Sequence, residues 1–133
     1  MAGELTKSEN WGELVKLFPD KQMPMPYVQE IFLLECEVAG VGFVEGIIPR
    51  SEKLADGNLV VLCREPDNKH DAQAIRCENA QGEKLGYVPR AKNEILSRLM
   101  DGGKMLYGKV AAKSITSNGK WVAITIKIYL RDL

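Results

Sequence analysis

The 133-residue sequence has little material for a metal centre or a disulfide framework. It contains one histidine, and its three cysteines, Cys36, Cys63 and Cys77, are odd in number and lack a Cys-x-x-Cys spacing. A zinc site would have to rely on carboxylates, whereas protein zinc sites are built mostly from cysteine and histidine. We therefore expect no metal and no cofactor, and interpret the cysteines as small apolar residues in a reducing compartment.

Long apolar runs and an excess of one charge are missing as well. Eighteen Lys and Arg balance 18 Asp and Glu, and no stretch approaches the roughly 20 apolar residues that span a bilayer. The opening residues, MAGELTKSENWGELVKLF, show no basic region followed by an apolar run, as a signal peptide would. With 45% hydrophobic and 27% charged residues, the composition predicts one globular domain, which we expect to be cytoplasmic and without a membrane partner.

The first 30 residues differ from the rest of the chain. Residues 6–18 are predicted to form a short helix, because Thr6 and Ser8 are suitable N-caps and Pro19 stops the run. Its apolar residues recur at helical intervals: Trp11, Leu14, Val15 and Phe18. The prolines in PDKQMPMPYVQE then exclude both a helix and a central strand. We divide the chain into an N-terminal helix with a proline-containing arm, residues 1–30, and a domain at residues 31–133.

From residue 31 the apolar pattern has a period of two, which indicates strands. The expected strands are 31–39, 43–48, 58–63, 73–78, 83–88, 104–114 and 120–130. One helix is expected after Pro89, with Ile95, Leu96, Leu99 and Met100 on one face and an end at Gly102-Gly103. This order predicts a mainly β fold with minor α content: a small OB-like or SH3-like β-barrel of about six strands.

The segment REPDNKHDAQAI, residues 64–75, holds the only histidine. Pro66, Asp67 and Asn68 are typical turn residues, but a turn does not account for Arg64 or His70. His70 and Asp71 are adjacent, so in an extended segment their side chains point to opposite sides and do not form a catalytic dyad. No hydrolase, zinc-protease, P-loop or dinucleotide motif occurs, and we expect no enzymatic activity.

The C-terminal hairpin carries a second signal. Alternate residues of KWVAITIKIYL form a purely apolar face, and the other face mixes aromatic residues with a lysine. Residues 104–133 hold six basic side chains against one acid, Asp132: Lys104, Lys109, Lys113, Lys120, Lys127 and Arg131. A basic face with rings is suited to single-stranded nucleic acid, because cations neutralise phosphates and rings stack on bases. A solvated face, or one covered by a helix or by the N-terminal arm, is the alternative.

Taken together, LVVLCREPDNKHDAQAIRCENAQGEKLGYVPRAKNEILSRLMDGG resembles the HIRAN domain, and the resemblance covers roughly residues 32–131. The spacing of its Arg-Glu-Pro-x-Asn step, the following Asp and Leu-Gly-Tyr-Val-Pro-Arg makes the match specific. This family occurs alone in bacteria and phage and fused to chromatin-remodelling helicases. The resemblance implies an OB-like or SH3-like barrel that binds DNA, and in the helicase-fused members a pocket for the unpaired 3′ end of a single strand.

The resemblance also implies a set of binding residues. Phe43 would stack on a base, Asp71 would accept a hydrogen bond from a terminal hydroxyl, and Arg90 would contact a phosphate. The full implied set is Phe43, Asn68, His70, Asp71, Tyr87, Arg90 and Trp121. Two positions depart from the family pattern: Gly42 stands where end-gripping members have a basic residue, and Lys69-His70 replaces a Pro-Tyr pair.

The leading hypothesis is therefore a non-enzymatic module that binds single-stranded DNA or DNA 3′ ends, in a repair or replication context. A protein-interaction adaptor that uses the MPMPY arm is the alternative. A metal-dependent enzyme acting on nucleic-acid ends through His70 and Asp71 is a third, more remote hypothesis.

Overall fold

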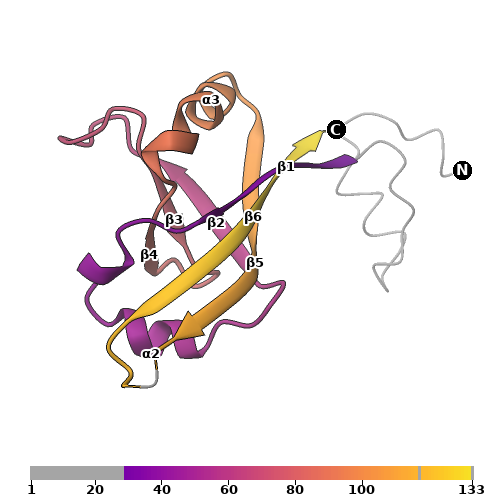
Figure 1. Ribbon diagram of the computed structural model, residues 1–133. Coiled ribbons are helices and arrows are strands. Elements are labelled where there is room, and N and C mark those ends of the chain that lie inside the picture. The colour runs from indigo at the N-terminus through magenta and orange to yellow at the C-terminus, as the bar shows by residue number, and fades with distance from the viewer. Residues whose placement is uncertain (1–28, 117, 133) are drawn as a thin grey trace, which may run out of the picture.

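The computed structural model describes residues 29–116 and 118–132 (Figure 1). The helix predicted at residues 6–18 lies outside the described residues, and so does the arm up to residue 28. The elements follow one another in the order β1 Gln29–Glu37, η2 Val41–Phe43, α2 Ile47–Glu52, β2 Leu59–Arg64, β3 Ile75–Glu78, β4 Lys84–Tyr87, α3 Arg90–Asp101, β5 Met105–Ile115 and β6 Val122–Asp132.

The six strands form one antiparallel sheet in the order β1-β6-β5-β2-β3-β4. Its two edges meet at one point just after β1, where Ala39 and Tyr87 exchange backbone hydrogen bonds of 2.7 and 2.9 Å. The neighbouring Val38 donates instead to the carbonyl of Ile124 on β6 at 2.8 Å. The sheet is thus curled and pinned at one bridge without closing as a full ladder, and the predicted mainly β, six-stranded architecture is confirmed.

The core lies on the inner face of the curled sheet. As the alternation in β6 predicts, its inward side chains are almost fully buried, from Val122 to Leu130. The larger set that packs with them is Cys36, Val38, Val41, Ile47, Leu54, Val60, Leu62, Ile75, Cys77, Leu85, Val88, Leu96, Leu106 and Val110. All three cysteines are free, and burial raises the pKa of the Cys36 thiol to about 11, which suits an apolar role.

A register shift in β5 corrects one detail of the predicted hairpin. Strict alternation places Ala112 in the core with Leu106 and Val110, but the pairing with β6 slips between Val110 and Ala112. Ala112 is therefore exposed, and Lys113 pairs with the inward-facing Ile124. The Lys113 ammonium donates to the carbonyls of Ser51 and Glu52 at 2.8 and 3.0 Å. This lysine therefore binds the end of α2 and does not belong to the outer face of the hairpin.

The strand predicted at residues 43–48 is wrong. The segment forms the 3₁₀ turn η2 and the start of α2 instead. Gly40 and Gly46 precede these elements with φ of 75° and 77°, a left-handed conformation that breaks an extended path and that glycine adopts at little cost. Pro49 then falls in the first turn of α2, where its missing N–H is not needed. The apolar residues of this segment mimic a strand, but only Ile47 among them is buried.

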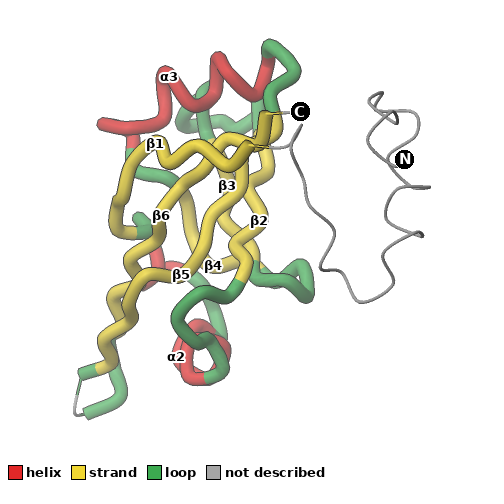
Figure 2. The backbone as a smooth tube through the Cα atoms, turned by 90° about the vertical axis from the view of Figure 1, so that its right-hand side faces the viewer, coloured by secondary structure: helices red, strands yellow, loops and turns green. Residues whose placement is uncertain are grey.

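Helix α3 follows Pro89 and ends at Gly102, as predicted. It lies across one end of the sheet and α2 lies at the other, with β1 running beneath α3 (Figure 2). Leu96 is buried and Leu99 packs against the core, but Ile95 is 70% exposed and does not share their face. Across residues 29–116 and 118–132, no helix has the length and apolar content to cross a bilayer.

Candidate functional site

Six of the seven residues implied by the resemblance lie around one hollow of about 530 Å³. They come from four separate parts of the fold: η2, the loop between β2 and β3, β4 and the start of α3. The lining consists of Ala39, Gly40, Phe43, Asn68, His70, Asp71, Ala74, Lys84, Tyr87, Val88, Arg90 and Asn93. We call this hollow the loop pocket. Its volume is within the range of about 300–1,000 Å³ typical of ligand sites.

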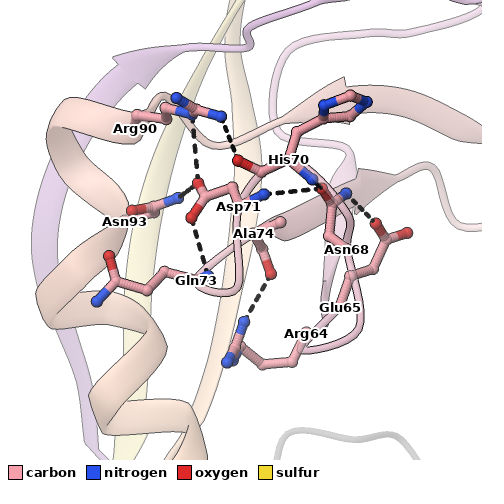
Figure 3. Close-up of polar contacts among 9 residues, drawn as sticks. All are labelled: Arg64, Glu65, Asn68, His70, Asp71, Gln73, Ala74, Arg90 and Asn93. Carbon is pink, nitrogen blue, oxygen red and sulfur yellow. Dashed lines mark hydrogen bonds and ion pairs between the residues drawn. The ribbon is translucent and has the colours of Figure 1, made fainter.

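Asn68 builds the loop that forms one wall of the loop pocket. Its side-chain oxygen accepts hydrogen bonds from the backbone N–H groups of His70 at 2.8 Å and Asp71 at 3.0 Å. Its amide nitrogen donates to Glu65 at 3.0 Å (Figure 3). All three bonds close the turn, as the turn residues in the sequence indicate, so Asn68 shapes the wall.

Asp71 links the same loop to α3. One carboxylate oxygen accepts from the backbone N–H of Gln73 at 2.9 Å, and the other accepts from the Asn93 amide at 2.8 Å and lies 3.7 Å from Arg90 (Figure 3). The Asn93 hydrogen bond, then the Gln73 amide and the charge of Arg90, hold the Asp71 pKa below its ordinary value. An ionised carboxylate has about four acceptor positions, so it retains capacity for a hydroxyl donor.

His70 and Arg90 line the mouth of the loop pocket. The Arg90 guanidinium donates to the His70 carbonyl, and much of this side chain stays exposed. The imidazole of His70 is directed away from the Asp71 carboxylate (Figure 3). The predicted divergence of these two neighbours therefore holds, and the two side chains do not form a dyad.

The structure gives Arg64, which the turn at residues 64–75 does not account for, a role in holding the loop. Its guanidinium donates to the carbonyls of Ala72 and Ala74 at 3.0 and 2.8 Å and to the Asp101 carboxylate at 2.8 and 3.1 Å. These bonds tie the loop to the last residue of α3, while Asp71 and Asn93 tie it to the first turns. The sequence signal for Arg64 is its place at the end of a strand; Asn93, which is only 2% exposed, gives no sequence signal beyond its polarity inside an amphipathic helix.

Tyr87, the last residue of β4, lines the loop pocket. Its hydroxyl donates to Glu65 at 2.8 Å, and the Lys84 ammonium lies 4.5 Å from its ring centroid. Burial of the Glu65 carboxyl opposes ionisation, but the hydrogen bonds from Asn68 and Tyr87, with the charges of Arg76 and Lys84, outweigh it, so the Glu65 pKa is lowered. The resemblance did not mark Glu65 or Lys84 as site residues. Of these two, Glu65 joins Tyr87 to Asn68 through its hydrogen bonds, and Lys84 adds a second cation to the lining.

Phe43 and Trp121 are exposed aromatic residues in different surroundings. Phe43 is 96% exposed and lines the loop pocket, whereas Trp121, 55% exposed, does not line it. Trp121 instead lies over Gly42: a Cβ at position 42 would fall 2.8 Å from the indole Cζ3 atom. In this conformation the indole occupies the space that a side chain at position 42 would take.

The basic hairpin is partly neutralised on its outer face. Edge strand β1 pairs with β6 and brings Glu30 to Lys109, with Nζ–O distances of 3.2 Å, and to the Tyr107 hydroxyl. The outer face also carries a row of rings across three strands, in which Tyr129 stacks on Tyr107 and meets Phe32 edge-on. The hairpin is thus less basic than its sequence alone indicates. Its outer face is also built from strands that do not line the loop pocket.

Binding of a metal ion would require several suitable side chains to lie together in the described part of the chain. Within the described ranges 29–116 and 118–132, no group of three or more His, Cys, Asp or Glu side chains is placed to hold a metal ion. His70 and Asp71 face apart, and the Asp71 carboxylate is bound by Asn93, Gln73 and Arg90. The lining of the loop pocket offers rings, hydrogen-bond partners and two cations.

Comparison with solved structures gives the same fold. A crystal structure of a protein from Lactobacillus plantarum is 28% identical, with a TM-score of 0.71 over 80% of this chain and 99% of that chain. The crystal structure of the HIRAN domain of human HLTF is 20% identical, with a TM-score of 0.60 over 77% of this chain and 79% of that one. The NMR structure of the HLTF HIRAN domain in its DNA-bound conformation is 18% identical, with a TM-score of 0.52 over 78% and 80%.

Among curated proteins, the chain is 31% identical over 68 residues to the helicase-like transcription factor of Oryctolagus cuniculus, which is 51% of this chain and 6% of that protein. It is 23% identical over 103 residues, 77% of this chain, to a putative SWI/SNF-related chromatin regulator of Arabidopsis thaliana and spans 11% of it. The chain thus corresponds to a small part of these relatives. The model of the HIRAN domain matches residues 31–131, and this chain belongs to the HIRAN domain family.

Proposed function

We propose that this chain is a DNA-binding module that takes the end of a single DNA strand into the loop pocket, in a repair or replication context. The observation that carries the proposal is the convergence of Phe43, the 68–71 loop, Tyr87 and Arg90 on one hollow of about 530 Å³. These residues come from distant parts of the sequence. A DNA-bound conformation of a HIRAN domain, that of HLTF, supports the choice of ligand.

The chemistry of the lining fits an unpaired nucleotide. Phe43 offers a ring that is almost entirely exposed, and stacking of a base on such a ring is worth roughly 1–3 kcal/mol irrespective of base identity. Lys84 and Arg90 supply two positive charges against the single carboxylate of Asp71, so a backbone phosphate at the mouth gains charge-assisted contacts. A base inside a duplex is stacked on both faces and offers none to Phe43, which favours a single strand over a duplex.

Asp71 is the group that favours an end with a hydroxyl. Its lowered pKa keeps it ionised at neutral pH, so it acts only as an acceptor. A terminal 3′-hydroxyl can donate to it, whereas a 3′-phosphate would bring a second negative charge beside the carboxylate. The proposed ligand is accordingly a single strand that ends in a free 3′-hydroxyl.

The test is fluorescence anisotropy at low salt with labelled oligonucleotides. Three probes of one sequence are compared: a single strand with a 3′-hydroxyl, the same strand with a 3′-phosphate, and a blunt duplex. The expected result is tightest binding to the hydroxyl-ended strand, lost when Tyr87 and Arg90 are both changed to alanine. Equal, weak binding to all three probes would contradict the proposal and direct the search to a protein partner.

A further inference from the structure

A second hollow lies between edge strand β1 and helix α3 and shares no lining residue with the loop pocket. It measures about 370 Å³, and its apolar lining includes Leu33 and Leu34 of β1 and Ile95 and Leu99 of α3. We call it the β1–α3 groove. Lys92 and Glu94 are its two charged lining residues, one of each sign, so the groove has no net charge to recruit an ionic ligand.

Two apolar side chains on these elements are open to water. Ile95, which lines the groove on the side of α3 that faces away from the core, is 70% exposed. Ile31 pairs with Leu130, whose side chain belongs to the core, yet Ile31 is 41% exposed. An inward-facing residue that stays open to water marks a seam where the core lacks a cover, and such seams are sites of apolar docking.

The chain itself supplies a segment with the complementary surface. Residues 6–18 place Trp11, Leu14, Val15 and Phe18 at positions i, i+3, i+4 and i+7, which is one stripe of a helix. A helix of 13 residues would measure about 20 Å, close to the roughly 18 Å of α3. So short a helix is marginal in water unless its apolar stripe is packed against a partner.

The connection is long enough to reach. Ten residues, 19–28, join the segment to the start of β1, and fully extended they reach at most about 33–36 Å. Leu33 and Leu34 lie only four and five residues into β1. A tether of this length holds the segment at an effective concentration in the millimolar range, so modest apolar contacts suffice for docking.

We propose that residues 6–18 form an amphipathic helix that docks in the β1–α3 groove of the same chain. The family match begins at residue 31, so this cover would be a property of this chain and not of the shared domain. It does not rest on DNA binding, and its experiment uses no DNA.

The experiment uses the full chain with Trp121→Phe, which leaves Trp11 as the only tryptophan. Emission of Trp11 and its quenching by acrylamide are measured in this background, with Ile95→Asp and with Leu59→Asp. Leu59 is the matched control, because it is an exposed apolar residue on β2 and does not line the groove. Circular dichroism checks that each variant folds.

Docking predicts blue-shifted emission and weak quenching in the background chain. Ile95→Asp should red-shift the emission and raise the quenching constant several-fold, and Leu59→Asp should leave both unchanged. Strong quenching of Trp11 in the background chain, or protection that survives Ile95→Asp, would overturn the proposal. Protection that disappears on dilution would also overturn it, because a second copy would then occupy the groove.

A double-mutant cycle gives an independent reading. Leu14→Asp and Ile95→Asp should each lower the thermal unfolding midpoint of the full chain, and the double variant should fall no further than the more severe single one. Additive effects would show that the two side chains do not meet and would contradict docking.

Discussion

At the scale of single residues, some side chains around the loop pocket stabilise its walls, and others are free to contact a ligand. Asn68, Arg64 and Glu65 spend their hydrogen bonds within the protein. Phe43 is the opposite case, because its ring is almost wholly exposed and η2 holds it at the rim. A half-buried brace and an exposed ring predict different consequences of substitution.

Phe43→Ala should weaken binding to a hydroxyl-ended single strand by roughly 1–3 kcal/mol, the value of one stacked base. Its unfolding midpoint should match that of the parent, since an exposed ring contributes little to the core. Anisotropy titration and thermal melting measure the two quantities. Leu59→Ala is the control, an exposed apolar residue outside the pocket. Unchanged affinity for Phe43→Ala would remove the ring from the site.

The clasp between Arg64 and Asp101 predicts a pH dependence of stability. The Arg64 hydrogen bonds and charge lower the Asp101 pKa in the folded state. The contribution is therefore present above the ordinary Asp value of about 3.9 and is lost as the pH falls through the lower folded pKa. Asp101→Asn should be less stable than the parent at pH 7 and should lose less stability on acidification.

Urea unfolding between pH 7 and pH 3 measures this difference. Asp56→Asn, in the turn before β2, is a control for removal of a surface carboxylate and should follow the parent curve. Parallel curves for Asp101→Asn and the parent would mean that the clasp does not stabilise the folded chain.

At the scale of elements, the single bridge between the sheet edges positions the pocket. A Cβ added to Gly86, next to Tyr87 in β4, would meet the Ala39 carbonyl at 2.4 Å and Val38 Cγ1 at 2.6 Å. Gly86→Ala should therefore separate the edges and destabilise the fold by about 1–3 kcal/mol, the usual cost of overpacking. Urea unfolding measures it, with Gly82→Asn as the control, since Gly82 has open space and asparagine tolerates its positive φ.

Stability of Gly86→Ala within about 0.5 kcal/mol of the parent would show that the bridge can yield, since substitutions away from such close contacts usually stay within that range. In that case the position of Tyr87 does not depend on the junction of the two edges.

Secondary structure is predicted correctly from sequence where the apolar residues of a segment keep one regular period. Strand β6 alternates without interruption, and its inner face was predicted residue by residue. The period misleads at residues 43–48, where two left-handed glycines turn an apolar run into helical turns, and at the bulge after Val110. Both irregularities depend on backbone conformation, which hydrophobic pattern does not encode.

The candidate site shows the same division. The resemblance named residues that the fold brings around one hollow, with Trp121 as the exception. It did not reveal Asn93 or Glu65, because their roles depend on contacts between segments 22 residues apart in the chain. Local sequence carries no record of such long-range pairs, so only the folded arrangement identifies them.

At the scale of the whole molecule, zero net charge makes the distribution of charge decisive. In the hairpin, which is the most basic part of the sequence, Lys109 forms an ion pair with Glu30 and Lys113 donates hydrogen bonds to the end of α2. Lys84 and Arg90 line the loop pocket together with one carboxylate, that of Asp71. Electrostatic attraction of a strand should therefore come from a small number of phosphate contacts at the pocket and not from a broad basic surface.

The salt dependence of binding tests this distribution. A single strand loses affinity with a slope of about 0.7 in log K against log salt for each phosphate neutralised, so two pocket cations predict a slope near 1.4 in magnitude. Arg90→Gln should lower it by about 0.7. Lys127→Gln, on the outer face of β6, should leave it unchanged, because that exposed lysine does not line the pocket. A steep slope that falls with Lys127→Gln would instead place the strand on the hairpin face, where the row of Phe32, Tyr129 and Tyr107 would provide the stacking surface.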